Sequence, residues 1–200
     1  MAFFRIKKIK GKEYAYIVEN KWKPTAKSVE LNASSRSRKH LTLRGSDMRG
    51  SRRDSLTMLK PRGSRQKVKE YVGRVYGLSL VNDVGFFEFL KIENVNEYIE
   101  NNNISNIIND LVGWELYKFN VNKNEFSIDL NSKKIQKNNK NVAFFINEGF
   151  MCGFTLKNLL EFKPEGDVQA DGYHLARAFV EAGIKVPQEV FVGLFGKVYK

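Results

Sequence analysis

Arginine and lysine side chains are concentrated between residues 35 and 69, where serine and glycine separate them. Guanidinium and ammonium groups donate charge-assisted hydrogen bonds to phosphate oxygens, and serine hydroxyls can join them. Arginine outnumbers lysine in residues 35–65, which favours bidentate contacts to phosphates and base edges. A solvated loop without a partner would have the same composition. We favour contacts to nucleic acid, made by Arg36, Arg38, Lys39, Arg44, Arg49, Arg52, Arg53, Arg62, Arg65, Lys67 and Lys69.

A second group of cations lies in stretches that are typical of β-strands. It consists of Arg5, Lys7, Lys8, Lys10, Lys12 and Arg74. Aromatic residues occur among them and offer rings on which bases could stack. The alternative, which we weigh as the more common outcome, is that these rings cover a small sheet. The aromatic candidates are Tyr14, Tyr16, Trp22, Tyr71 and Tyr76.

Catalytic residue types are sparse. Asp129 stands in the strand-like segment "FSIDL", which suggests a metal site, but such a residue more often faces water on an edge strand. His40 and His174 are the only histidines and Cys152 is the only cysteine, so no zinc-ligand spacing occurs. We expect Cys152 to be a buried thiol. The sequence predicts no catalytic residue, metal site or cofactor, and it favours a protein that is not an enzyme without deciding the question.

The net charge is confined to the first third of the chain. Residues 1–77 hold 21 Lys and Arg against 6 Asp and Glu, whereas residues 78–200 hold 13 against 16. A focused positive field favours polyanions, since neutralised phosphates release counterions. With 42% hydrophobic residues the chain can build a core, and no run approaches the roughly 20 apolar residues that span a bilayer. We expect a soluble, cytoplasmic protein that does not bind membranes.

The first 77 residues are predicted to form three antiparallel strands. The segments "FFRIKKI" (3–9) and "YAYIVEN" (14–20) predict a hairpin that turns at Gly11. "QKVKEYVGRVYG" (66–77) predicts a third strand with one basic face, although a short helix is also compatible with it. Residues from about 25 to 64 hold no sustained period of 2 or 3.6. A connection of that length usually has a function or lacks fixed structure, and we interpret it as an insertion in the strand module.

Two short patterns in this module resemble a known family. The first is Lys12, Tyr14, Tyr16, Ile17, Val18 and Glu19, and the second is Arg65, Gln66, Val68, Tyr71, Val72 and Gly73. Together they resemble the N-terminal DNA-contacting module of some insertion-sequence transposases, which lacks the long basic segment between them. The resemblance covers residues 3–77 and implies that this module contacts DNA. It does not imply transposition, because about 120 residues remain for a domain that needs three carboxylates around two metal ions.

The remaining chain, residues 78–200, is predicted to be an α+β body. We expect a helix in residues 83–92 and one amphipathic helix, capped by Asn94, broken near 101–103 and ended by Gly113. Strands are expected in 114–121, 125–130 and 141–146, with the first two forming a hairpin. Residues 131–140 extend the second strand or form a loop. Three short helices are expected in 155–199, with starts at Thr155, at Asp167 or Asp171, and at Pro187.

The predicted fold class is therefore α+β: a basic antiparallel β-meander with a long loop insertion (1–77), followed by a mixed body (78–200) that ends in short helices. The leading hypothesis is nucleic-acid binding, to DNA or RNA, without catalysis. A second hypothesis is a protein-interaction or assembly module tethered to a nucleoprotein such as the ribosome, with a partner on the C-terminal helices through Phe191, Leu194, Phe195 and Tyr199. A third is a reduced metal-dependent nuclease related to transposases, in which Asp129 acts with Asp110, Glu115 or Glu148.

Overall fold

The computed structural model describes residues 2–21 and 65–199. Its first two strands, β1 (Ala2–Ile9) and β2 (Lys12–Lys21), form the predicted antiparallel hairpin. The hairpin turns through Lys10 and Gly11, whose φ angles are 49° and 76°. Two residues with positive φ are what a tight hairpin turn of the matching twist requires, and glycine adopts this conformation without steric cost. The insertion predicted at about 25–64 lies outside the described residues, and the description resumes at Arg65.

Strand β3 (Arg65–Gly77) completes the N-terminal meander and connects it to the body. It pairs antiparallel with β2 and then, through Arg74–Gly77, parallel with the later strand β6. A Cβ atom at Gly73 would lie 2.2 Å from the carbonyl oxygen of Asn141, so only glycine allows β3 to approach β6 at this point. The strand predicted for 66–77 is confirmed, and the helical alternative is wrong.

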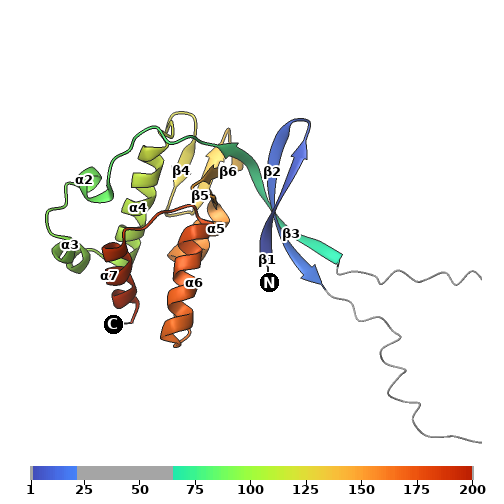
Figure 1. Ribbon diagram of the computed structural model, residues 1–200. Helices are drawn as coiled ribbons and strands as arrows, with labels where there is room; N and C mark the ends of the chain where they lie inside the picture. Colours follow the sequence, from blue (N-terminus) through green and yellow to red (C-terminus); the bar gives the residue numbers. More distant parts are fainter. Residues whose placement is uncertain (1, 22–64, 200) are drawn as a thin grey trace, which may run out of the picture.

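Within residues 2–21 and 65–199, seven strands make one sheet in the order β1-β2-β3-β6-β5-β4, with β7 also paired to β6. Figure 1 shows β1, β2 and the first half of β3 projecting from the body as a three-stranded arm. The α+β class with an N-terminal β-meander is thus confirmed. Because β3 belongs to both parts, the sheet runs continuously from the arm into the body.

The three helices after β3 agree with the prediction except where the third of them ends. Helix α2 (Phe86–Leu90) falls within the expected segment, and α3 (Val95–Asn101) is capped by Asn94 as predicted. After the predicted break, α4 (Ile104–Lys118) is capped by Asn103 and continues through Gly113. The predicted strand at 114–121 and its hairpin are therefore wrong. A glycine costs a helix about 1 kcal/mol, and burying the α4 side chains on either side of it outweighs that cost.

Four strands follow α4. They are β4 (Ser127–Asp129), β5 (Lys134–Lys137), β6 (Lys140–Ile146) and β7 (Gly149–Met151). The first and third were expected. The polar stretch 131–140 supplies β5, which pairs with β4 and turns into β6 through Asn138 and Asn139, both with positive φ. Strand β7, for which the sequence has no clear local pattern, pairs antiparallel with β6.

Three helices close the chain as predicted: α5 (Gly153–Leu160), α6 (Val168–Glu181) and α7 (Gln188–Val198). Asp167 caps α6 and Pro187 precedes α7. Helix α5 begins earlier than expected, since Cys152 and not Thr155 occupies its cap, and Thr155 Oγ1 accepts a hydrogen bond from the Cys152 N–H at 3.1 Å. Within the described residues, no helix is long and apolar enough to cross a membrane.

Two apolar clusters lie on opposite faces of the sheet. The larger joins one face of β6 to α4, α5, α6 and α7 around Phe144, Leu111 and Leu194. The smaller lies under the arm and consists of Ala15, Ile17, Val72, Val75, Ala143 and Cys152, with Phe4, Phe150 and Phe154 against it. Cys152 is fully buried, as predicted, and burial raises the pKa of its thiol. The smaller cluster fixes the arm to the body.

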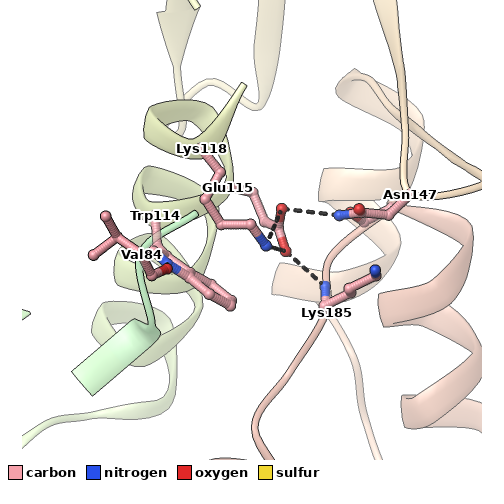
Figure 2. A network of polar contacts seen from close by, with 7 residues as sticks. Val84, Trp114, Glu115, Lys118, Asn147 and Lys185 are labelled. Carbon is pink, nitrogen blue, oxygen red and sulfur yellow. Dashed lines mark hydrogen bonds and ion pairs between the residues drawn. The ribbon is translucent and has the colours of Figure 1, made fainter. Parts of the chain in front are cut away.

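A buried charged pair connects α4 to two loops of the body. Glu115 is fully buried, and its carboxylate lies 3.2 Å from Lys118 Nζ. The same carboxylate accepts hydrogen bonds from Asn147 Nδ2 and from the Lys185 backbone N–H, each at 2.9 Å (Figure 2). Lys118 also lies 3.9 Å from the ring centre of Trp114. Every hydrogen-bonding oxygen of Glu115 is therefore satisfied inside the fold, which a buried carboxylate requires.

Candidate nucleic-acid interface

The arm has two faces with different chemistry. In antiparallel pairing, residues opposite each other in register place their side chains on the same face. Lys7 and Tyr14 oppose each other between β1 and β2, and Tyr14 opposes Arg74 of β3. In the next row, Arg5, Tyr16 and Tyr71 oppose one another. We call this surface the basic-aromatic face, defined by Arg5, Lys7, Lys12, Tyr14, Tyr16, Tyr71 and Arg74.

Three tyrosine rings make a continuous surface in the middle of the basic-aromatic face. The ring centres of Tyr16 and Tyr71 lie 5.3 Å apart, and those of Tyr14 and Tyr71 lie 6.4 Å apart. Tyr71 is the most open of them, with an exposed fraction of 50%. Partial burial and the neighbouring Tyr16 and Tyr14 raise the pKa of Tyr71.

The cations of this face surround the rings. Lys7 Nζ lies 4.9 Å from the centre of the Tyr16 ring, within the range of a cation–π contact. Arg5 crosses β2 and donates from Nη1 to Oε1 of Gln66 on β3. Arg74 lies 4.7 Å from the centre of the Tyr76 ring. Among the described residues, none of these three cations makes an ion pair with a carboxylate.

The carboxylates of the arm all lie on its other face. Glu13 opposes Lys8, Glu19 opposes Lys67, and Glu70 opposes Ile17 of the smaller apolar cluster. Strands β1, β2 and β3 contain no other Asp or Glu. Charge is thus separated between the two faces: the basic-aromatic face has four cations and no carboxylate, and the opposite face mixes both signs.

The predicted site residues consequently do not share a single face. Arg5, Lys7, Lys12 and Arg74 lie together on the basic-aromatic face, whereas Lys8 and Lys67 lie on the opposite face and Lys10 forms the hairpin turn. Lys69 lines a cleft behind the arm. The candidates from Arg36 to Arg62, with Trp22, lie outside the described residues, as does the Arg65 side chain. Tyr76 packs edge-to-face on Phe126 at 5.3 Å and belongs to the body core, as the alternative for the aromatic residues anticipated.

Lys137 is a cation near this surface that the sequence analysis does not select. Its Nζ lies 5.1 Å from the Tyr76 ring centre and 4.8 Å from that of Phe126, and it pairs with Glu125. Nothing in the local sequence distinguishes it from other lysines of the stretch 133–140, because its place depends on the pairing of β5 with β6. Because its charge is paired with Glu125, we do not include Lys137 in the basic-aromatic face.

A cleft of about 580 Å³ lies behind the arm, between β3, β5 and α5. Lysines line it, among them Lys69, Lys133, Lys134 and Lys157, together with Glu70 and Glu161. Lys133 forms an ion pair with Glu161, and this pairing lowers the pKa of the Glu161 carboxyl. The cleft therefore mixes both charge signs and is less suited to a polyanion than the basic-aromatic face.

Of the four carboxylates considered for a nuclease, three have structural partners, and Glu148 lies in the turn between β6 and β7. Asp129 is exposed at the end of β4 and accepts hydrogen bonds from the Asn131 N–H, the Ser132 N–H and the Ser132 hydroxyl, which lower the pKa of its carboxyl. Asp110 accepts from the Tyr98 hydroxyl at 2.7 Å, and Glu115 is paired with Lys118. Across residues 2–21 and 65–199, no group of three His, Cys, Asp or Glu side chains could hold a metal ion.

The residues considered for a partner on the last helix are largely used by the fold. Leu194 is fully buried, and Phe191 and Phe195 pack against the larger core cluster. The Tyr199 hydroxyl donates to the buried carboxylate of Asp171, which also accepts from the backbone N–H groups of Glu165 and Gly166. These hydrogen bonds lower the pKa of the Asp171 carboxyl, while burial and the hydrogen bond to Asp171 raise the pKa of Tyr199 to about 12. They anchor the chain end to the start of α6.

Comparison of this chain with protein-family models, with curated proteins and with solved structures finds no match. The resemblance of residues 3–77 to the transposase module stays a prediction.

Proposed function

We propose that this protein binds nucleic acid without acting on it chemically, through the basic-aromatic face and the basic segment that follows β2. The separation of charge on the arm is the observation that supports this proposal most. Four cations and no carboxylate share a face with three tyrosines, while all three carboxylates of the arm are on the other side. Phosphates bind where cations are not already neutralised, and bases stack on open rings.

The basic segment is joined to the arm at both of its ends. Residues 22–64 contribute 11 Lys and Arg against 3 Asp and Glu. The segment leaves the arm at Lys21 and returns at Arg65, and these two residues are paired neighbours in β2 and β3. Its charge is thus tethered to the arm at both ends. The proposal includes DNA contact of the kind that the transposase resemblance implies, and a cytoplasmic location.

The salt dependence of binding tests this proposal. We expect the full chain to bind a fluorescently labelled oligonucleotide with an association constant whose logarithm falls linearly with the logarithm of salt concentration, because bound cations release counterions. Anisotropy titrations at several salt concentrations measure this slope. Deleting residues 34–63, which leaves the paired ends of β2 and β3 intact, should make the slope shallower without abolishing binding. No binding at low salt to any DNA or RNA would refute the proposed function.

A further inference from the structure

We propose that the basic-aromatic face binds single-stranded nucleic acid and that an unpaired base stacks on Tyr71. This inference rests on the proposed function and specifies which form of nucleic acid the arm accepts.

The Tyr71 ring is exposed on the basic-aromatic face. Half of the Tyr71 side chain is open to solvent, although its neighbours Tyr14 and Tyr16 are each in contact with it. The opposite face of the arm packs on the smaller apolar cluster, so the sheet does not need this ring for its core. An aromatic surface of this kind suits the planar face of a base, and stacking on it does not depend on sequence.

The cations of this face lie beside the rings. Across the sheet, one row runs Arg5, Tyr16, Tyr71 and the next runs Lys7, Tyr14, Arg74. In each row, a cation from β1 lies at one edge of the aromatic surface: Arg5 in the first row and Lys7 in the second. In the second row, Arg74 adds a cation on the β3 side. A strand whose bases lie on the rings would have its phosphates beside these cations, which is how stacking and backbone contacts combine in single-strand binding.

The aromatic surface suits single strands better than duplexes. In a duplex the bases stack on each other, so a protein reaches only their edges and the phosphates. A two-stranded ribbon can enter the major groove, but a surface of three phenol rings there would find no base face to contact. Unpaired bases offer those faces. The charge of the arm suits both forms, whereas its aromatic surface suits only the single strand.

The experiment compares four probes of equal length, about 15 nucleotides, which is within the site size of single-strand binding modules. They are oligothymidylate, oligouridylate, an abasic DNA strand and a DNA duplex. The wild-type full chain should bind the first two more tightly than the abasic strand and the duplex. Tyr71→Leu should lose affinity for the base-bearing single strands by about tenfold, as expected for one stacked base, and should bind them about as weakly as wild type binds the abasic strand. Tyr71→Phe keeps the ring and should bind like wild type.

The outcomes distinguish this inference from the proposed function. If wild type binds the abasic strand or the duplex as tightly as the single strands, the inference is overturned while nucleic-acid binding stands. If no probe binds, both are overturned. The two base-bearing strands need not bind equally, because oligouridylate has a 2′-hydroxyl that can make an additional contact. Tighter binding of both strands than of the abasic strand supports the inference, whether or not oligouridylate is preferred. Should Tyr71→Leu fail to fold in a thermal melt, the wild-type comparison of base-bearing and abasic strands still decides.

Discussion

Replacing Glu115 with alanine is expected to lower the free energy of unfolding by about 3–5 kcal/mol, the usual cost of removing one partner from a buried ion pair. The variant leaves the Lys118 ammonium group buried without a carboxylate, and the Asn147 amide and the Lys185 N–H lose their acceptor. Since these groups belong to α4, to the turn after β6 and to the loop before α7, the loss should affect the whole body. Urea denaturation followed by circular dichroism measures it.

Two control variants separate charge from packing. Glu115→Gln keeps an oxygen acceptor and should cost less than Glu115→Ala. The double variant Glu115→Leu, Lys118→Met removes both charges and should recover stability relative to Glu115→Ala, because a well-packed apolar pair can replace a buried ion pair without loss. A cost below about 1 kcal/mol for Glu115→Ala would contradict the account, since that is the range of exposed ion pairs.

Neutralising the cations of the basic-aromatic face is expected to have the largest effect on binding. In the variant Arg5→Gln, Lys7→Gln, Arg74→Gln, the slope of the salt dependence should become shallower by about 2, because each lost phosphate contact to a single strand removes about 0.7 units of slope. The affinity near physiological salt should fall roughly ten- to hundredfold. In free energy, this loss corresponds to about one or two charge-assisted hydrogen bonds. Anisotropy titrations against a single-stranded oligonucleotide measure both quantities.

The matched control carries the same change in net charge on the other side of the arm. The variant Lys8→Gln, Lys67→Gln, Lys69→Gln removes three cations that lie on the opposite face or line the cleft behind it. It weakens the overall positive field equally but leaves the basic-aromatic face intact, so its loss of affinity should be clearly smaller. Equal losses in the two variants would mean that only net charge matters and that this face has no special role.

The division between these two groups of cations could not be predicted from the sequence. Simple alternation along 66–77 places Tyr71 with Lys67 and Lys69 and places Arg74 on the other side. Two register shifts between β2 and β3 change this, so that Tyr71 and Arg74 share a face with Tyr16 and Tyr14. A β-bulge inserts a residue into one strand and turns the following side chains to the other face. It leaves no signal in residue periodicity beyond the presence of Gly73.

The hairpin β1–β2 could be predicted because its evidence is local. A glycine follows a lysine between two β-branched and aromatic segments, and both turn residues adopt positive φ. The parallel pairing of β3 with β6 joins residues that are about 70 positions apart, so no local sequence pattern predicts it.

The stretch after Gly113 shows the opposite error. Aromatic and β-branched residues following a glycine favour a strand, but Trp114 and Leu116 are buried in one core together with Ile107 and Leu111. Tertiary burial decides between helix and strand here, and local preference does not. The candidate tyrosines illustrate the same limit, since only the folded sheet separates Tyr71, which is open, from Tyr76, which packs on Phe126.

The most direct test of the central claim is to map where nucleic acid touches the chain. Ultraviolet cross-linking of the full chain to a bromouridine-substituted single strand, followed by trypsin digestion and mass spectrometry, identifies the contacted peptides. The three tyrosines fall in two tryptic peptides, residues 13–21 with Tyr14 and Tyr16 and residues 70–74 with Tyr71. The account predicts cross-links in these peptides, strongest at Tyr71. Cross-links found only in residues 86–199 would contradict it.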